Sequence, residues 1–158
     1  MPACKTKLNR SAEVCAMSAS ARQNFEARMD NLPRAAGFIE AFCELQGVAP
    51  TDALRLTLIV EELFTNTIVH GHGGDHESPV CIEVAIGPTQ MTLRYEDSAP
   101  PFDPLWYLQD AHPDLDAHVD ERRVGGLGLP LVAQLVEQFD YAHVDGFNCL
   151  SLVLKRGG

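Results

Sequence analysis

The chain has 158 residues and a formal net charge of −10, from 12 Lys and Arg against 22 Asp and Glu. This length predicts about one domain, and a composition of 46% hydrophobic and 22% charged residues excludes a disordered chain. An acidic surface repels phosphate backbones and anionic lipid headgroups, so we expect no direct binding to nucleic acid and none to membranes.

Apolar runs and cysteines indicate the compartment. No run approaches the ~20 residues of a transmembrane helix, and no apolar signal segment follows the basic residues Lys5, Lys7 and Arg10. The five cysteines form no Cys-x-x-Cys pair, which is typical of reduced thiols. We therefore expect a cytoplasmic protein.

The N-terminal part carries little periodicity. Residues 1–20 mix small, polar and charged side chains, which predicts a mobile tail ahead of a single domain over residues 21–158. Around Phe25, a weak signal predicts a short strand within residues 24–30.

Two helices are predicted next. Apolar residues at helical spacing begin at Leu32, and Gly47 is a natural stop. The second helix is longer: it begins at Pro50, with Thr51 as candidate N-cap, and ends near Gly71.

Hairpins, a long loop and a third helix make up the remaining chain. Alternating patterns predict two pairs of strands, at residues 80–86 with 91–97 and 139–144 with 147–155, the second pair around a type I′ turn at Asp145-Gly146. Between the pairs lie a loop over residues 98–124, with a short helix near 105–108, and a helix from 125–129 to an apolar stripe ending at Phe139. Because hairpins pair antiparallel, we expect an α+β fold: a two-layer α/β sandwich with helices on one face of a mixed, mostly antiparallel sheet.

The second helix carries two polar strips on an otherwise apolar surface. One strip holds Thr57, Glu61 and Thr65 and is expected to face solvent. The other aligns the following four residues: Arg55, Glu62, Asn66 and His70. The last three recur every four residues, so they lie one helical turn apart. This second strip is either a site, with a carboxylate for proton transfer and an amide oxygen for a cation, or a second exposed strip.

Asp97 breaks the alternation of its strand. Period 2 places it on the core face with Met91, Leu93 and Tyr95, where an unpaired carboxylate is unfavourable. Either it hydrogen-bonds the N–H groups of a ligand at the strand end, or it caps the turn that follows.

A glycine-rich segment, Gly125-Gly126-Leu127-Gly128-Leu129-Pro130, precedes the third helix. Glycines at a helix start allow a phosphate to approach free backbone N–H groups. The alternative is a flexible joint, because the segment matches neither a P-loop nor a dinucleotide fingerprint.

Four potential metal ligands lie close together at His70, His72, Asp75 and His76. Their spacing is near that of metallo-β-lactamase-type hydrolases, which makes a zinc hydrolase a rival hypothesis. Compared with that family's spacing, one extra residue separates His72 from Asp75, and the segment follows a predicted helix rather than a strand.

Taken in order, three segments resemble the boxes of the GHKL (histidine kinase-like, Bergerat-fold) ATPase superfamily, and its RsbW-type anti-sigma factor serine/threonine kinases in particular. Residues 61–71, EELFTNTIVHG, resemble the N-box; residues 95–104, YEDSAPPFDP, the first glycine box; and residues 125–132, GGLGLPLV, the second. The resemblance covers residues 24–155 and implies the Bergerat-type sandwich.

The resemblance also implies roles for individual residues. Glu62 would be the general base, Asn66 would hold Mg²⁺ between the ATP phosphates, and Asp97 would bind the exocyclic amine of adenine. Backbone N–H groups at Gly126 and Gly128 would bind phosphates, and residues 103–124 would form a lid over the nucleotide. The remaining nucleotide-binding positions would be His70, Ala99, Phe102, Leu127 and Leu129.

By the same resemblance, the protein would bind ATP and Mg²⁺, phosphorylate a Ser or Thr of a small antagonist protein, sequester a sigma factor or similar partner, and form a homodimer. Ala99 stands where the family has Gly, which is unfavourable if that backbone needs a positive φ. This departure favours the alternative function, a nucleotide-responsive or nucleotide-free binding module without kinase activity.

Overall fold

The computed structural model describes residues 18–104 and 128–157. Within these residues, five strands form one sheet in the order β1-β2-β3-β5-β4. The strands are β1 (Ala19–Glu26), β2 (Pro79–Ile86), β3 (Gln90–Asp97), β4 (Gln138–Val144) and β5 (Phe147–Lys155). The helices are a 3₁₀ turn η2 (Met29–Asn31), α1 (Leu32–Leu45), α2 (Pro50–Asn66), a π-helical turn η3 (Thr67–His72) and α5 (Gly128–Leu135).

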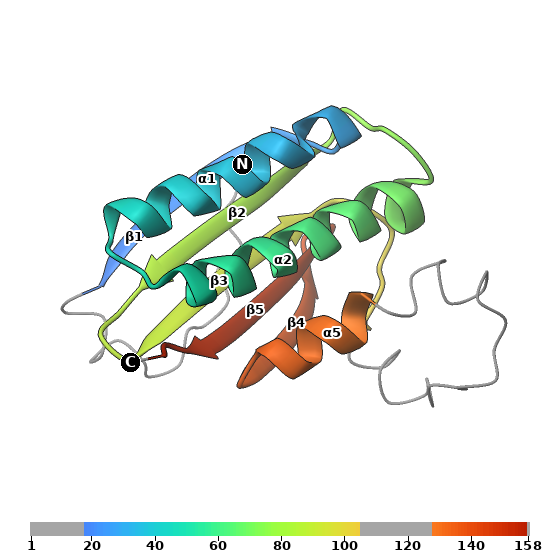
Figure 1. Cartoon of the computed structure of the whole chain (residues 1–158). Helices are drawn as coiled ribbons and strands as arrows, with labels where there is room; N and C mark the ends of the chain where they lie inside the picture. The colour runs from blue at the N-terminus through green and yellow to red at the C-terminus, as the bar shows by residue number, and fades with distance from the viewer. Residues whose placement is uncertain (1–17, 105–127, 158) are drawn as a thin grey trace, which may run out of the picture.

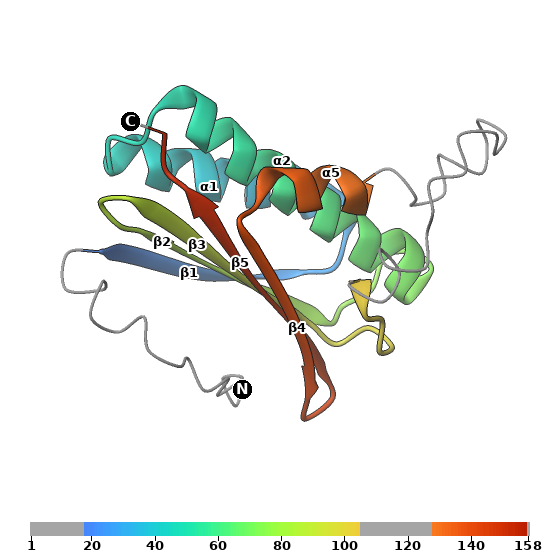
Figure 2. The ribbon, with the colours of Figure 1, turned by 90° about the horizontal axis from the view of Figure 1, so that it is seen from below.

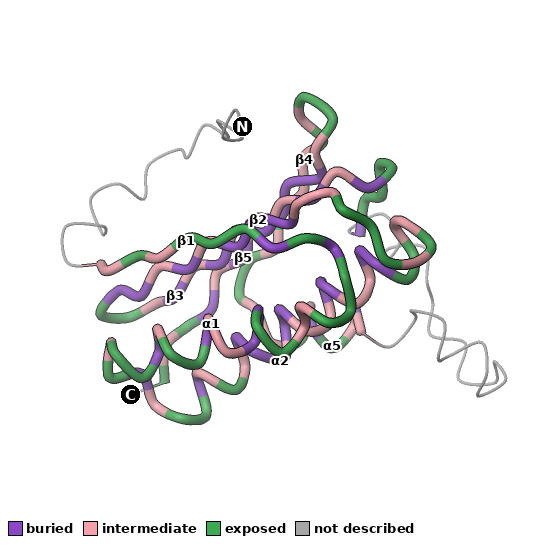
Figure 3. The backbone as a smooth tube through the Cα atoms, turned by 90° about the horizontal axis from the view of Figure 1, so that it is seen from above, coloured by how far each residue is buried: buried purple, intermediate pink, exposed green. Residues whose placement is uncertain are grey.

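The helices and the sheet form two layers. Helices α1, α2 and α5 cover one face of the sheet, and residues 18–104 and 128–157 place no helix on the other face (Figures 1 and 2). Buried residues gather between the two layers (Figure 3), where the inward side chains of β2, β3 and β5 meet α1 and α2. The predicted α+β sandwich is confirmed, and the described strands all pair antiparallel, so the sheet is not mixed.

Two of the predicted turns have the backbone that their residues favour. Asp145 and Gly146 have φ angles of 52° and 84° and join Val144 to its partner Phe147, as a type I′ hairpin requires. Gly47, with a φ of 67°, follows the end of α1. Both predictions are confirmed.

The predicted bounds of the first strand are wrong. β1 runs from Ala19 to Glu26 and pairs with β2 along its whole length, so the strand takes in two residues of the predicted tail. Phe25 is its single buried residue, and an edge strand with so little buried surface carries a weak hydrophobic period. Residues 1–17, the rest of that tail, lie outside the described residues.

The second helix also begins differently from the prediction. Its N-cap is Ala49, with Pro50 in the first helical positions, so Thr51 is inside the helix and is not the cap. Pro needs no hydrogen-bond partner for its nitrogen, which is why it is stable there. Thr57 is a second correction: it is 5% exposed rather than facing solvent, and its hydroxyl donates to the Ala53 carbonyl oxygen.

The third helix is shorter than its apolar stripe predicts. α5 ends at Leu135, whose carbonyl oxygen accepts a hydrogen bond from Arg55 at 3.0 Å. The Glu137 N–H already donates to the Val153 carbonyl oxygen, and Phe139 lies in β4, where the strand predicted over residues 139–144 places it. None of the helices in the described part of the chain is long and apolar enough to cross a membrane.

Arg55 and Asp52 fasten the end of the chain to α2. The Arg55 guanidinium donates to Asp52 Oδ1 and to the Lys155 carbonyl oxygen, both at 2.9 Å. The other carboxylate oxygen of Asp52 accepts the Gly157 N–H at 3.0 Å. Arg55 therefore has a structural role and does not join the site strip predicted for it.

We expect Asp52→Ala to lower the free energy of unfolding by about 2 kcal/mol, because it leaves the Arg55 guanidinium and a backbone N–H without their acceptor. Urea denaturation measures the change. Arg22→Ala is the control, since its 3.7 Å contact with Glu83 joins side chains that are 39% and 33% exposed, and a long ion pair of this kind contributes under about 0.5 kcal/mol. Equal losses in the two variants would contradict this role of Asp52.

Candidate functional site

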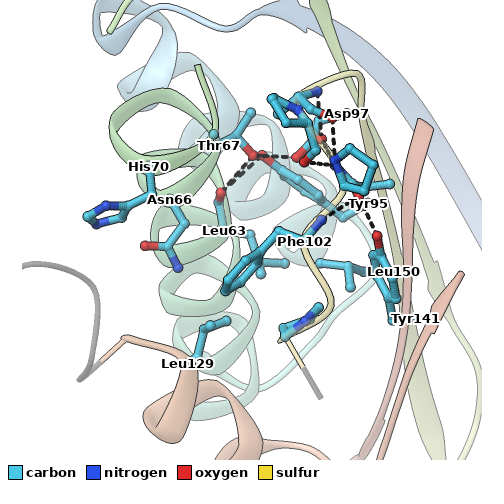
Figure 4. A pocket seen from close by; sticks show the side chains of 16 residues that line it. Leu63, Asn66, Thr67, His70, Tyr95, Asp97, Phe102, Leu129, Tyr141 and Leu150 are labelled. Carbon is cyan, nitrogen blue, oxygen red and sulfur yellow. Dashed lines mark hydrogen bonds between the residues drawn. The ribbon is translucent and has the colours of Figure 1, made fainter. Parts of the chain in front are cut away.

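A cavity of about 360 Å³ opens between the end of α2, the end of β3, the start of β5 and the start of α5. This volume lies in the range of about 300–1,000 Å³ that is typical of small-molecule sites. Figure 4 shows Asn66 and His70 on one side of the pocket, Tyr141 on the other, and Asp97 between them. The lining residues are Leu63, Asn66, Thr67, His70, Gly71, Tyr95, Asp97, Ala99, Pro100, Pro101, Phe102, Pro104, Leu129, Tyr141, Asn148 and Leu150.

Most of the predicted site residues lie around this one cavity. They come from three separate segments of the sequence, and they are Asn66, His70, Asp97, Ala99, Phe102 and Leu129. Gly126 and Leu127, the short helix predicted near 105–108 and the lid beyond Pro104 lie outside the described residues.

Glu62 and Gly128 do not line the cavity, but they lie against each other beside it. A Cβ atom added to Gly128 would overlap Oε2 of Glu62. None of the described residues hydrogen-bonds the Glu62 carboxylate, which is half-buried. A carboxylate that has no hydrogen-bond partner among the described residues, and that lies against the start of α5 beside a cavity, is available to accept a proton.

Asn66 is the last residue of α2, where the chain widens into the π-helical turn η3. Such turns are frequent at functional sites. The Nδ2 atom of Asn66 is buried without a hydrogen-bond partner among the described residues. An amide that lines a cavity and keeps an unsatisfied atom fits a site that is completed by a ligand. Its oxygen is of the type that Mg²⁺ prefers.

Asp97 is buried, as the alternation of its strand predicts, with 7% of its surface exposed. Its Oδ2 accepts the Thr67 hydroxyl at 2.7 Å, and its Oδ1 accepts the Asn148 amide at 2.9 Å and the Ala99 N–H at 3.1 Å. The bond from the Ala99 N–H is the turn cap that the sequence offered as an alternative to ligand binding. Asp97 therefore caps the turn and also lines the cavity.

Tyr95 is linked to the Asp97 carboxylate through the Thr67 hydroxyl. Burial, and secondly the negative charge of Asp97, raise the pKa of Tyr95 well above 10. The phenol is therefore neutral, and it lies 2.6 Å from the Thr67 hydroxyl, to which it can donate while Thr67 donates to Asp97. The chain of hydroxyl groups delivers a donor to the carboxylate.

Ala99 is not strained. Among the described residues, Asp145 is the one non-glycine residue with a positive φ, so the backbone at Ala99 accepts a side chain. Its methyl group is buried against Gly71, where an added Cβ would come within 2.7 Å of the Ala99 Cβ. The chain therefore places its alanine opposite a glycine.

Gly71→Ala is accordingly expected to lower the free energy of unfolding by about 1–3 kcal/mol through overpacking. The double variant Gly71→Ala with Ala99→Gly moves the methyl group to the other partner and should recover most of the loss. Thermal or urea unfolding of the four proteins in this cycle measures the coupling. Additive losses would show that the two residues do not share this space.

The histidine-rich segment has other contacts. Among the described residues, which include all of 70–76, no group of three or more His, Cys, Asp or Glu is placed to hold a metal ion. The rings of His72 and His76 stack at 4.3 Å, and Asp75 accepts the Met29 N–H at 2.8 Å. Burial, and secondly His76, lower the pKa of His72. These contacts fasten the segment to the start of η2 and give the zinc hydrolase no support.

Sequence patterns did not predict three of the polar residues that line the cavity: Thr67, Tyr141 and Asn148. Asn148 carries the same signal that singled out Asp97: it is a polar residue on the face of β5 that also holds Leu150 and Leu152. Tyr141 and Thr67 carry no such signal, because both residue types are common in strands and helix ends.

Comparison with known proteins identifies the family. Residues 25–154 match the model of the histidine kinase-like ATPase domain. The chain belongs to this family. Among curated relatives, it is 27% identical over 94 residues to the serine-protein kinase RsbW of Listeria monocytogenes and 26% identical to that of Listeria innocua. Each alignment covers 59% of this chain and 60% of the relative, so the chain matches a little over half the length of these RsbW proteins.

Solved structures agree on the fold. The RsbU and RsbW domains of a Mycobacterium tuberculosis protein match 89% of this chain, and 34% of theirs, with a TM-score of 0.61 and 14% identity. The SiaB–SiaC complex of Pseudomonas aeruginosa matches 85% of this chain and 88% of its own, with a TM-score of 0.62 and 15% identity. The predicted resemblance to the RsbW-type branch of the histidine kinase-like ATPases is confirmed.

Proposed function

We propose that this chain is an ATP-binding, RsbW-type regulator that transfers a phosphoryl group to a Ser or Thr of a small antagonist protein and sequesters a sigma factor or similar partner in the cytoplasm. The observation that carries the proposal is Asp97. It is a buried carboxylate that accepts three hydrogen bonds and lines a cavity of about 360 Å³. The same cavity is lined by Asn66 and bordered by Glu62.

The residues divide the work between the two ends of the nucleotide. Asp97 accepts the exocyclic amine of adenine, while Leu129 and Phe102 supply apolar contacts to the base and sugar. At the other end, Asn66 would hold Mg²⁺, which would supply positive charge against the phosphates. Phosphoryl transfer needs positioning and charge neutralisation more than covalent chemistry, so a few side chains suffice.

Phosphate binding at the start of α5 fits a strongly acidic protein. With a net charge of −10, the surface attracts no anion, so phosphates must be held locally. The proposal assigns this to backbone N–H groups at Gly126 and Gly128, together with the Mg²⁺ on Asn66. Glu62, beside Gly128, accepts the proton of the attacking hydroxyl.

Calorimetric titration with ATP and Mg²⁺ tests the nucleotide half of the proposal, and phosphate transfer to the antagonist tests the other half. We expect binding that Asn66→Ala weakens strongly in Mg²⁺ but little in EDTA, because the side chain acts through the cation. Absence of binding at millimolar ATP would show that the proposed nucleotide site is wrong. Binding without transfer would favour a nucleotide-responsive binding module.

Protein partners follow from the same charge. An acidic surface steers a basic partner surface and repels nucleic acid. A homodimer is part of the proposal, and light scattering of the purified protein tests it. Association that weakens steeply with added salt is expected for the partner complex.

A further inference from the structure

Asn148 makes more side-chain hydrogen bonds than any other residue lining the described part of the cavity. Its Nδ2 lies 2.9 Å from Asp97 Oδ1, 3.0 Å from the Ala99 carbonyl oxygen and 3.2 Å from the Pro100 carbonyl oxygen. Its Oδ1 accepts the Tyr141 hydroxyl at 2.6 Å and the Phe102 N–H at 3.2 Å. The residue as a whole is 6% exposed, so these bonds are shielded from water.

The surroundings fix which way the amide points. One side of the group meets only acceptors, namely a carboxylate and two carbonyl oxygens. The other side meets a backbone N–H and the hydroxyl of Tyr141, whose pKa is raised mainly by burial, so the phenol stays protonated and donates. A flipped amide would face donor to donor and acceptor to acceptor. Asn148 must therefore present its N–H groups to Asp97.

All the hydrogen bonds that the described residues make with the Asp97 carboxylate therefore come from donors. Thr67, Ala99 and Asn148 use three of the roughly four acceptor positions of a carboxylate. What remains is a single position that can accept a hydrogen bond from a ligand. A base with an amine at that point satisfies it, whereas an oxo group would place two acceptors together.

Resting on the proposed nucleotide site, we propose that Asn148 is a positioning residue that holds Asp97 as a hydrogen-bond acceptor for a 6-amino purine and fastens the Ala99–Phe102 segment to the same point. The second part follows from its bonds to Ala99, Pro100 and Phe102. Base selection and the shape of the segment that leads into the predicted lid thus depend on one side chain from β5.

Base selectivity tests the first part. The affinities for ATP and for inosine triphosphate, which has a 6-oxo group, are compared by calorimetry for wild type, Asn148→Asp and Tyr141→Phe. Wild type should prefer ATP by about ten- to hundredfold, the contribution of one hydrogen bond to a charged group. In Asn148→Asp, the introduced carboxyl group lies close enough to that of Asp97 for the two to share a proton. The protonated pair can donate a hydrogen bond to the 6-oxo group, so the preference for ATP over inosine triphosphate should fall about tenfold.

Tyr141→Phe is the matched control, because it removes a partner of Asn148 that does not touch Asp97. Its ratio of the two affinities should stay within about twofold of wild type, since the donors to Asp97 remain. An unchanged ratio in Asn148→Asp, or an equal loss in both variants, would overturn the assignment of Asn148 as the residue that sets base preference.

Amide hydrogen exchange tests the second part without nucleotide. In Asn148→Leu, the Phe102 N–H loses its acceptor, and exchange at Ala99 and Phe102 should become at least about tenfold faster. Asn148→Asp keeps an acceptor for Phe102, and that amide should retain its protection. Equal exchange in wild type and Asn148→Leu would overturn the clamp. If wild type binds no nucleotide, the proposed function fails, while this exchange experiment still decides what Asn148 holds.

Discussion

Glu62→Gln is expected to lower the rate of phosphoryl transfer by about 10²–10⁴-fold, the usual contribution of a general base. The substitution keeps the size of the side chain and removes its ability to take the proton of the attacking hydroxyl. ATP affinity should change by less than about threefold, because the base acts on the acceptor substrate and not on the nucleotide. Transfer of labelled phosphate, measured beside calorimetric binding, separates the two quantities.

Glu61→Gln is the matched control. The residue is the same, the position is adjacent on α2, and its exposure class is the same as that of Glu62, but it belongs to the other polar strip of the helix. Transfer in Glu61→Gln should stay close to wild type. If Glu61→Gln loses transfer while Glu62→Gln keeps it, the general base is Glu61, and the proposed mechanism is refuted.

Gly128→Ala is expected to weaken ATP binding by about ten- to hundredfold, because its methyl group overlaps Oε2 of Glu62. Either the carboxylate or the start of α5 must move, and both border the predicted phosphate position. The effect should be visible in calorimetric titration with ATP and Mg²⁺.

The double variant Gly128→Ala with Glu62→Ala separates crowding from chemistry. Removing the carboxylate makes room for the new methyl group, so ATP affinity should return to within about threefold of wild type. Transfer should remain absent, because the base is gone. If affinity does not recover, the methyl group interferes with the phosphates directly, and the contact with Glu62 is not the cause.

Sequence predicted the fold well where hydrophobic period and turn chemistry act together. The β4–β5 hairpin shows this, because Asp145-Gly146 sets both the turn and the register that follows. β1 shows the opposite, since an edge strand with Phe25 as its one buried residue carries almost no pattern. The apolar stripe predicted a longer α5, but the helix ends at Leu135, whose carbonyl oxygen accepts a hydrogen bond from Arg55, 80 residues away in the chain.

The candidate site was predicted where a residue breaks the rule of its own element. Asp97 was found in this way, on the core face of β3. Asn148 breaks the same rule in β5 and was overlooked. The contact between Ala99 and Gly71 could not be predicted, because it joins two ordinary small residues from different segments, and no local pattern marks such a pair.

The position of β5 has a consequence for how the pocket assembles during folding. Strand β5 is not at an edge of the sheet: it lies between β3 and β4 and brings Asn148 to the cavity. Until β5 pairs with β3, the pocket lacks one wall and Asp97 lacks the Asn148 amide as a donor. In that state β3 has an open edge that can pair with another chain, so folding intermediates with an unpaired β5 should bind no nucleotide and should aggregate.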